Sequence, residues 1–162
     1  MPVIVLESEN AGQTLAIGAA LGRILRGGDV LALSGALGAG KTQLTKGVAA
    51  GLGVADDEPV VSPTFVLMRE YAGRLRLYHL DTYRLGGADE LWALGIDELF
   101  AEQTGVVVIE WADRVAEILP ERAWRIELSH VDADRRRIEI HVSDAARLEA
   151  LCAALEGGGD RI

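Results

Sequence analysis

Residues 34–43, SGALGAGKTQ, contain the pattern G-x-x-x-x-G-K-[ST] in Gly35, Gly40, Lys41 and Thr42. Glycines at this spacing let the backbone curl so that successive N–H groups face phosphate oxygens, and a following helix adds partial positive charge. The lysine of such a loop reaches the β- and γ-phosphates of a nucleotide, and the adjacent hydroxyl coordinates Mg²⁺. The pattern therefore predicts a binding site for a nucleoside triphosphate and Mg²⁺.

The base of the nucleotide is predicted by elimination. Guanine-specific proteins with this loop carry an [NT]-K-x-D motif, but the only asparagine here is Asn10, and Lys46 is followed by Gly47 and Val48. The LSGGQ signature of ABC-type ATPases is absent as well. ATP is the expected nucleotide.

Two acidic residues follow apolar runs and are candidates for the metal and the attacking water. VVVIE ends at Glu110, and LYHLD ends at Asp81. A P-loop hydrolase needs a carboxylate at the end of a strand next to the loop, and burying one costs several kcal/mol unless a cation compensates it. Both residues are predicted to be catalytic and metal-binding, and which of them contacts the metal directly stays open. His79 either assists these acids or, as we favour, is an ordinary strand histidine.

Three further features are candidates for the site. SPTF, residues 62–65, follows a polar loop, and Thr64 is predicted to act as a switch residue that swings a hydroxyl toward the γ-phosphate. Arg84 either contacts phosphate or a partner or pairs with a surface acid. Arg135, Arg136 and Arg137 form the one dense basic cluster, which either binds a ligand or partner or, as we favour, is exposed to solvent.

The elements that must position these residues alternate between strands and helices. Apolar periodicity predicts helices at 10–26, 41–52, 88–102 with a break near Gly95, before Pro120, and 144–156. It predicts strands at 2–7, 29–35 and 105–111, with hairpins from 65–71 with 75–80 and from 123–131 with 135–143. The glycine loop then lies between a buried strand and the helix that begins at Lys41. We expect one domain over residues 1–156 and a flexible tail over 157–162.

The composition limits the classes of partner. A net charge of −9 repels phosphate backbones, so the chain is not expected to bind DNA or tRNA by itself. No apolar stretch approaches the roughly 20 residues of a membrane span, and the N-terminus lacks the pattern of a secretory signal. We expect a cytoplasmic protein. Cys152 is the single cysteine, which excludes an internal disulfide. We expect Cys152 to act as a small apolar residue on the last helix.

The chain resembles the bacterial TsaE (YjeE) family in GALGAGKT, SPTF, EY, HLDTYRL and IEWADR, which occur in this order over residues 7–143. The resemblance implies an α/β fold, a three-layer P-loop NTPase-like sandwich with a mainly parallel central sheet and antiparallel additions. It implies an ATPase that serves the formation of N6-threonylcarbamoyladenosine at position 37 of tRNAs. It also implies the TsaB and TsaD proteins as partners, which stimulate hydrolysis and hold the tRNA.

The same resemblance assigns roles to individual residues. Thr42 and Glu110 are expected to hold Mg²⁺, Asp81 to assist at the metal or the water, and Trp111 to flank the site. Thr14 is expected near the nucleotide. The full set of expected nucleotide-binding residues is Gly35, Gly38, Ala39, Gly40, Lys41, Thr42, Gln43, Thr14 and Trp111. Gln43 stands where the family often has threonine.

Two other functions are compatible with the glycine loop. A small-molecule kinase would need a basic lid over ATP, and residues 85–104 contain no Arg or Lys. A nucleotide-gated binding protein would bind ATP and hardly hydrolyse it. ATP turnover with and without partner proteins separates these functions from a partner-dependent ATPase.

Overall fold

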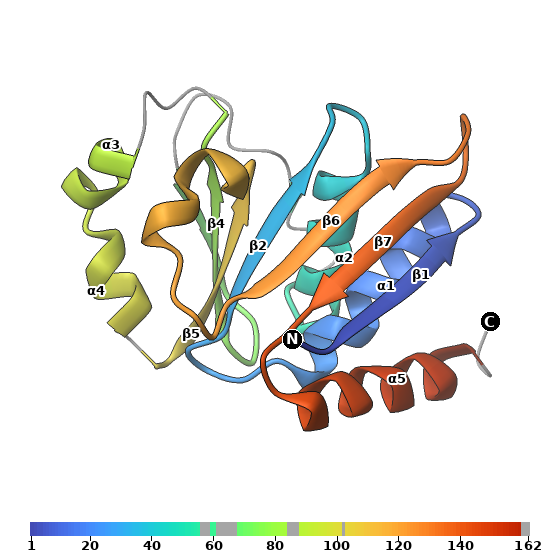
Figure 1. Ribbon diagram of the computed structural model, residues 1–162. Helices are drawn as coiled ribbons and strands as arrows, with labels where there is room; N and C mark the ends of the chain where they lie inside the picture. Colours follow the sequence, from blue (N-terminus) through green and yellow to red (C-terminus); the bar gives the residue numbers. More distant parts are fainter. Residues whose placement is uncertain (56–58, 61–67, 84–87, 102, 160–162) are drawn as a thin grey trace.

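A seven-stranded sheet forms the centre of the molecule, with the order β1-β7-β6-β2-β5-β4-β3 (Figure 1). The computed structural model describes residues 1–55, 59–60, 68–83, 88–101 and 103–159. The strands are β1 Val3–Ser8, β2 Val30–Gly35, β3 Met68–Tyr71, β4 Arg76–Asp81, β5 Gly105–Glu110, β6 Trp124–His130 and β7 Arg136–His141. The central strands β6, β2, β5 and β4 are parallel, and β3, β7 and β1 add antiparallel edges.

The middle of the sheet is apolar because helices cover both of its faces. All six residues of β5 are buried, as its continuous apolar sequence predicts for a parallel strand inside an α/β protein. β4 is buried from Leu77 to Asp81 and yet contains His79 and Asp81, which face the same side as Leu77 because side chains alternate along a strand. The polar residues of this edge are therefore inside the molecule.

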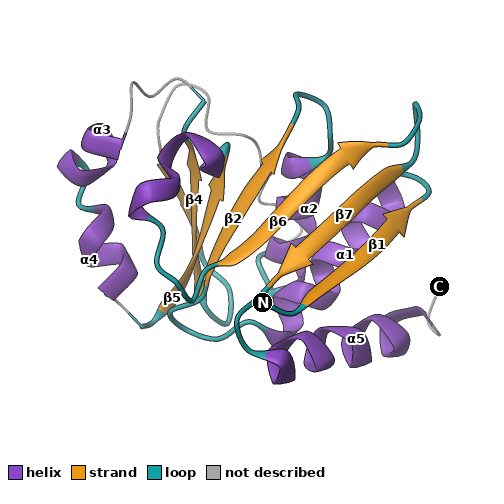
Figure 2. Cartoon of the chain, in the orientation of Figure 1, coloured by secondary structure: helices purple, strands orange, loops and turns teal. Residues whose placement is uncertain are grey.

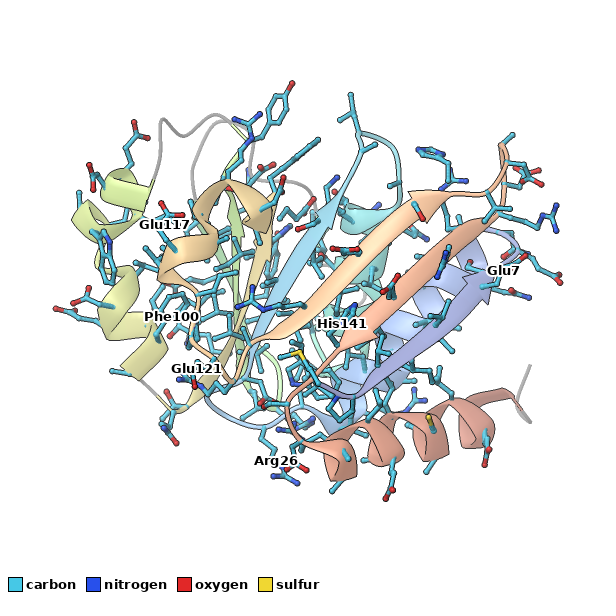
Figure 3. All side chains as sticks on the ribbon, viewed as in Figure 1. Glu7, Arg26, Phe100, Glu117, Glu121 and His141 are labelled. Atoms are coloured by element: carbon cyan, nitrogen blue, oxygen red, sulfur yellow. The ribbon has the colours of Figure 1, made fainter. Side chains whose placement is uncertain are left out.

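The helices form the outer layers of a three-layer α/β arrangement (Figure 2). Helices α1 (Ala11–Ile24) and α2 (Lys41–Gly51) pack on one face, and α5 (Ala145–Gly159) lies beside α1. Helices α3 (Ala88–Ala93) and α4 (Ile96–Ala101) and the 3₁₀ helix η1 (Ala112–Ile118) cover the other face. Phe100 of α4 points toward the sheet and packs against the apolar cluster between the sheet and these three helices (Figure 3). The expected fold class is confirmed.

Helices α1 and α2 touch along a seam of four glycines, Gly18 and Gly22 on α1 and Gly47 and Gly51 on α2. A Cβ placed on Gly47 would lie 2.2 Å from the backbone oxygen of Leu15 and 2.8 Å from the Cα of Gly18. A Cβ on Gly22 would lie 2.4 Å from the backbone oxygen of Val48. Only glycine allows backbones to approach this closely, so the seam fixes the position of α2 and of the loop before it.

Polar side chains fix the ends of α1. Its N-cap, Asn10, accepts a hydrogen bond from the backbone N–H of Gln13 at 2.9 Å. At the other end, Arg74 donates to the carbonyls of Gly22, Arg23 and Leu25 at 2.8–3.0 Å. These carbonyls belong to the last turn and the C-cap, where intrahelical donors run out. The β3–β4 hairpin, which contains Arg74, thus holds the helix layer against the sheet.

Most predicted elements are confirmed within one to three residues, and three differences remain. The helix before Pro120 is the 3₁₀ helix η1. The predicted C-terminal hairpin is confirmed as β6 and β7, but β6 also pairs in parallel with β2 and so joins the central sheet, which was not predicted. Helix α5 extends to Gly159, three residues into the segment predicted as a tail, since glycine weakens a helix by about 1 kcal/mol without forbidding it. Across the described ranges, every helix is too short or too polar to cross a bilayer.

Candidate functional site

The glycine loop connects β2 to α2 with backbone conformations that require glycine. Gly38 and Gly40 have φ values of 80° and 105°, in the left-handed region. Gly40 is the N-cap of α2 and supplies no side-chain hydrogen bond to the first turn. The first turn of α2 therefore offers its backbone N–H groups to an anion. Ala39 is fully buried beneath the loop.

Lys41 folds back across the loop that precedes it. Its Nζ donates to the carbonyl oxygens of Gly35 at 2.5 Å and Ala36 at 3.0 Å, and it lies 3.8 Å from the centre of the Trp111 ring. Burial lowers the pKa of Lys41 below 10.5, because removal from water disfavours the charged form, and the nearby charges of Glu110, Asp81 and Asp113 partly oppose this. The ammonium group is thus held at the mouth of the loop, close to the site acids.

Asp81 and Glu110 lie side by side at the carboxyl ends of neighbouring parallel strands. Their Cα atoms are register partners between β4 and β5, and the two residues are 8% and 2% exposed. The hydroxyl of Thr42 donates to Glu110, with 3.1 Å to Oε1 and 3.4 Å to Oε2. Asp81 Oδ1 accepts from the backbone N–H of Tyr83 at 2.9 Å. Glu110, and not Asp81, is therefore the carboxylate that contacts Thr42.

The Thr42–Glu110 pair has the donor chemistry of a magnesium site. Mg²⁺ prefers oxygen ligands and usually takes one or two carboxylates while phosphates and water supply the rest. Within the described part of the chain, no three His, Cys, Asp or Glu side chains gather closely enough to hold a metal by themselves. A hydroxyl and a carboxylate beside the glycine loop fit an ion that is bound together with a nucleotide.

Trp111 is the one described residue other than glycine with a positive φ, 60°. Such a conformation costs of order 1–3 kcal/mol and persists where neighbouring contacts impose it. The hydroxyl of Thr82 donates to the carbonyls of Glu110 at 3.0 Å and Trp111 at 2.7 Å and so fixes the turn that follows β5. The strained turn places the indole ring against Lys41 and 4.8 Å from the ring of Tyr83.

Two predicted nucleotide-binding residues lie on the side of the loop that faces α1. The methyl group of Thr14 is 3.7 Å from the position a Cβ would take on Gly40. The Thr14 hydroxyl is 2.7 Å from the hydroxyl of Ser8. Gln43 donates its side-chain amide to the carbonyl of Ala11 at 3.1 Å, so it links α2 to α1. Thr64 lies outside the described residues.

The β6–β7 hairpin contributes contacts to the loop that the sequence did not predict. Arg136 donates to the carbonyl of Gly38 at 3.3 Å, and the His130 ring lies 3.9 Å from a Cβ position on the same glycine.

His79 is another residue of the site that the sequence analysis did not favour. We expected an ordinary strand histidine, but its Nε2 contacts Oε2 of Glu110. The alternation His79-x-Asp81 was the available signal, because it places both side chains on one face.

The family described as "Threonylcarbamoyl adenosine biosynthesis protein TsaE" matches residues 8–138 of this chain. The chain belongs to the TsaE family. The matched residues include the glycine loop, Asp81, Glu110 and Trp111, whereas the α5 helix lies outside the TsaE match.

Individual relatives and a solved structure agree with this assignment. A TsaE from Treponema pallidum is 44% identical over 133 residues, which cover 82% of this chain and 96% of that protein. A TsaE from Bacillus subtilis is 43% identical over 147 residues, covering 90% and 89%. The crystal structure of Bacillus subtilis YdiB superposes with a TM-score of 0.78 at 36% identity and covers 96% of this chain and 95% of that one.

Proposed function

We propose that this chain is the ATP-hydrolysing component of the system that forms N6-threonylcarbamoyladenosine at position 37 of tRNAs. Both relatives described above bear the name tRNA threonylcarbamoyladenosine biosynthesis protein TsaE. The observation that carries the ATPase proposal is that Lys41, Thr42 and Glu110 meet at one edge of the sheet. This arrangement joins a phosphate-binding loop to a buried carboxylate, which is what hydrolysis of a nucleotide requires.

The loop and Lys41 would bind the phosphates of ATP. The backbone from Gly38 to Thr42 and the first turn of α2 supply N–H donors and partial positive charge. Lys41 would exchange the carbonyls of Gly35 and Ala36 for phosphate oxygens, while its contact with the Trp111 ring fixes the direction of approach. Thr14 and Gln43 border this region from the α1 side and complete the proposed nucleotide site.

Thr42 and Glu110 would hold Mg²⁺. When bound, Mg²⁺ would supply positive charge beside the phosphates of the nucleotide. Asp81 is adjacent to Glu110, and the N–H of Tyr83 orients its carboxylate. We assign Asp81 to the orientation of the attacking water or of a water on the metal, and Thr64 to a switch that responds to the γ-phosphate.

Partner proteins TsaB and TsaD complete the proposed system, and tRNA would meet this chain only through them, in the cytoplasm. The acidic surface supports this division, because a chain with a net charge of −9 does not attract a polyanion. Hydrolysis is then expected to be slow in the isolated chain and faster in the complex.

ATP turnover by the pure chain, repeated with purified TsaB and TsaD, tests the proposal. Lys41→Ala should abolish hydrolysis and greatly weaken nucleotide binding, and Glu110→Gln should keep binding but lose Mg²⁺-dependent hydrolysis. Phosphate transfer to a metabolite without either partner would instead show a kinase. If Asp81→Asn loses Mg²⁺-dependent hydrolysis and Glu110→Gln does not, Asp81 and not Glu110 is the carboxylate that holds the metal.

A further inference from the structure

His79 is buried at the metal side of the sheet and touches the carboxylate that faces Thr42. Its exposed fraction is 0%, and its Nε2 contacts Oε2 of Glu110, whose side chain is 3% exposed. His79 lies on β4 opposite Val108 of β5, one alternation before Asp81 and on the same face of the sheet. The imidazole therefore lies beneath the proposed metal site, where solvent does not reach it.

The hydrogen-bond chemistry of the pair determines where the imidazole carries its proton. An ionised carboxylate only accepts hydrogen bonds, so the contact requires an N–H on Nε2. His79 Nδ1 is buried and has no hydrogen-bond partner among the described residues. A proton on Nδ1 would be a buried donor without an acceptor, which is costly. The contact with Glu110 is thus a hydrogen bond that His79 donates from Nε2.

This donation divides the two oxygens of Glu110 between two neighbours. Oε2 receives the N–H of His79, while Oε1 is the nearer oxygen to the hydroxyl of Thr42, at 3.1 Å. A carboxylate on a freely rotating side chain would sample several orientations, and a buried hydrogen bond on one oxygen selects one of them. The other oxygen, Oε1, is then held next to Thr42 in the first turn of α2.

We propose that His79 is a positioning residue, which holds Glu110 through the Nε2–H···Oε2 hydrogen bond so that its other oxygen and Thr42 together bind the metal of the nucleotide complex. This inference rests on the proposed function of the site as a Mg²⁺-nucleotide site. It also explains a polar strand residue among apolar neighbours, since Leu77 precedes His79 on the same face and Val108 lies opposite. A leucine at position 79 would fill this space without burying a polar nitrogen.

The test compares His79→Gln, whose amide N–H can take the place of Nε2–H, with His79→Leu, which fills the space without a donor. ADP affinity is measured by titration calorimetry on the purified full chain, in EDTA and in Mg²⁺, and the ratio of the two affinities gives the gain due to the metal. Loss of such an orienting contact typically lowers metal affinity about 10–100-fold. We expect this ratio to be about tenfold or more lower in His79→Leu than in the wild type, with the ADP affinity in EDTA unchanged. His79→Gln should keep most of the gain.

Two further variants keep the outcome decisive. If His79→Leu does not fold, as judged by its melting curve, His79→Asn replaces it, because the shorter amide cannot reach Glu110. In a Glu110→Gln background, His79→Leu should not lower further the gain in ADP affinity due to Mg²⁺. The contact between His79 and the Glu110 carboxylate is already changed in that background.

A gain that is unchanged in His79→Leu, or equally lost in His79→Gln, overturns the inference. Failure of the wild-type chain to bind ADP both in EDTA and in Mg²⁺ would instead contradict the proposed nucleotide site.

Discussion

Lys41 is surrounded by groups that act on its charge in opposite directions. Burial disfavours the ammonium form, whereas two carbonyl oxygens, the Trp111 ring and the site acids favour it. The net effect lowers the pKa of Lys41 below 10.5. A lysine with a lowered pKa opposes folding while it is charged, and this opposition declines as the pH rises from the lowered value to 10.5, the value in the unfolded chain. The same titration acts on binding with the opposite sign, because phosphate requires the charged form.

Nucleotide affinity should therefore fall at alkaline pH, and the fall should begin below pH 10.5. The steepest slope expected for one proton is about tenfold per pH unit, equivalent to about 1.4 kcal/mol. Calorimetric titration of ADP from pH 7 to 10 measures the profile. Lys46→Arg is the matched control, because it removes the only other lysine, which is exposed, and should leave the profile unchanged. A flat profile in the wild type would show that Lys41 keeps its proton throughout.

The sequence predicted residues whose role follows from a local pattern and missed those brought in by distant segments. Lys41, Thr42 and the strand-end acids were recognisable because a motif or an apolar run marks each of them. Arg136 reaches Gly38 across 98 positions, and no spacing in the sequence connects the two. His79 was weighed and judged ordinary, since its contact with Glu110 depends on the pairing of β4 with β5.

At the scale of elements, the α1–α2 seam makes a clear prediction for Gly47→Ala. The added Cβ would meet backbone atoms on α1 at 2.2 Å and 2.8 Å, and backbone cannot rotate away as a side chain can. Overpacking of this kind costs typically about 1–3 kcal/mol, which exceeds the roughly 1 kcal/mol that alanine gains in helix propensity. We expect a lower free energy of unfolding in urea denaturation.

Gly157→Ala is the control for the seam, because a Cβ on Gly157 meets nothing within 4 Å. The same change of residue, also in a helix, should there be neutral or stabilising by up to about 1 kcal/mol. Equal stability of Gly47→Ala and the wild type would mean that the two helices separate at little cost.

An ion pair with two hydrogen bonds holds the start of helix α5, whose Leu151 is also buried in the core. Arg147 donates to both oxygens of Asp29, at 2.6 Å and 3.1 Å, with both side chains 11% exposed. Removing one partner of a largely buried pair costs about 3 kcal/mol. Arg147→Ala should therefore lower the melting temperature and the hydrogen-exchange protection of α5. Arg137→Ala, which breaks an exposed pair with Glu139 at 3.6 Å, should change stability by less than about 0.5 kcal/mol.

Local signals predicted the elements, and long-range pairing determined their order in the sheet. Asn10, Gly40 and the turn around Asp132 mark boundaries that the chain itself encodes. Nothing in the sequence of β6 indicates that it pairs with both β7 and β2. The four glycines were visible in the sequence, yet the contact between the two helices was not, because it depends on which faces pack together.

Across the whole molecule, the arginine cluster of the β6–β7 hairpin is engaged by the chain itself. Arg135 pairs with Asp132 and Glu7, and Arg136 donates to four backbone carbonyls. The pKa of Asp132 is lowered to about 2 by hydrogen bonds from the backbone and side chain of Arg135, which favour the carboxylate. The cluster therefore stabilises the hairpin tip and the glycine loop.

The face of the sheet beside this cluster carries no described helix over β6, β7 and β1, where His141 is exposed in part (Figure 3). A groove of about 340 Å³ next to the loop is lined by Asp113, Glu127, Glu139 and Arg137 among others. Three carboxylates against one guanidinium give this groove a negative charge, which a nucleic acid backbone would not favour.

The isolated chain should accordingly bind tRNA more weakly than a dissociation constant of about 100 µM, the weak end of non-specific binding at physiological salt. Fluorescence anisotropy with labelled tRNA, with and without TsaB and TsaD, measures this. Micromolar binding by the chain alone that weakens with added salt would show a nucleic acid surface that the charges of the described residues do not explain.

The glycine seam also limits how this molecule can evolve. A larger residue at any of the four positions needs space from a partner that is already the smallest amino acid, so no second substitution within the seam can compensate for the first. We therefore expect these positions to change rarely and without correlated changes. Methods that infer contacts from co-varying residues would then miss the closest approach between α1 and α2.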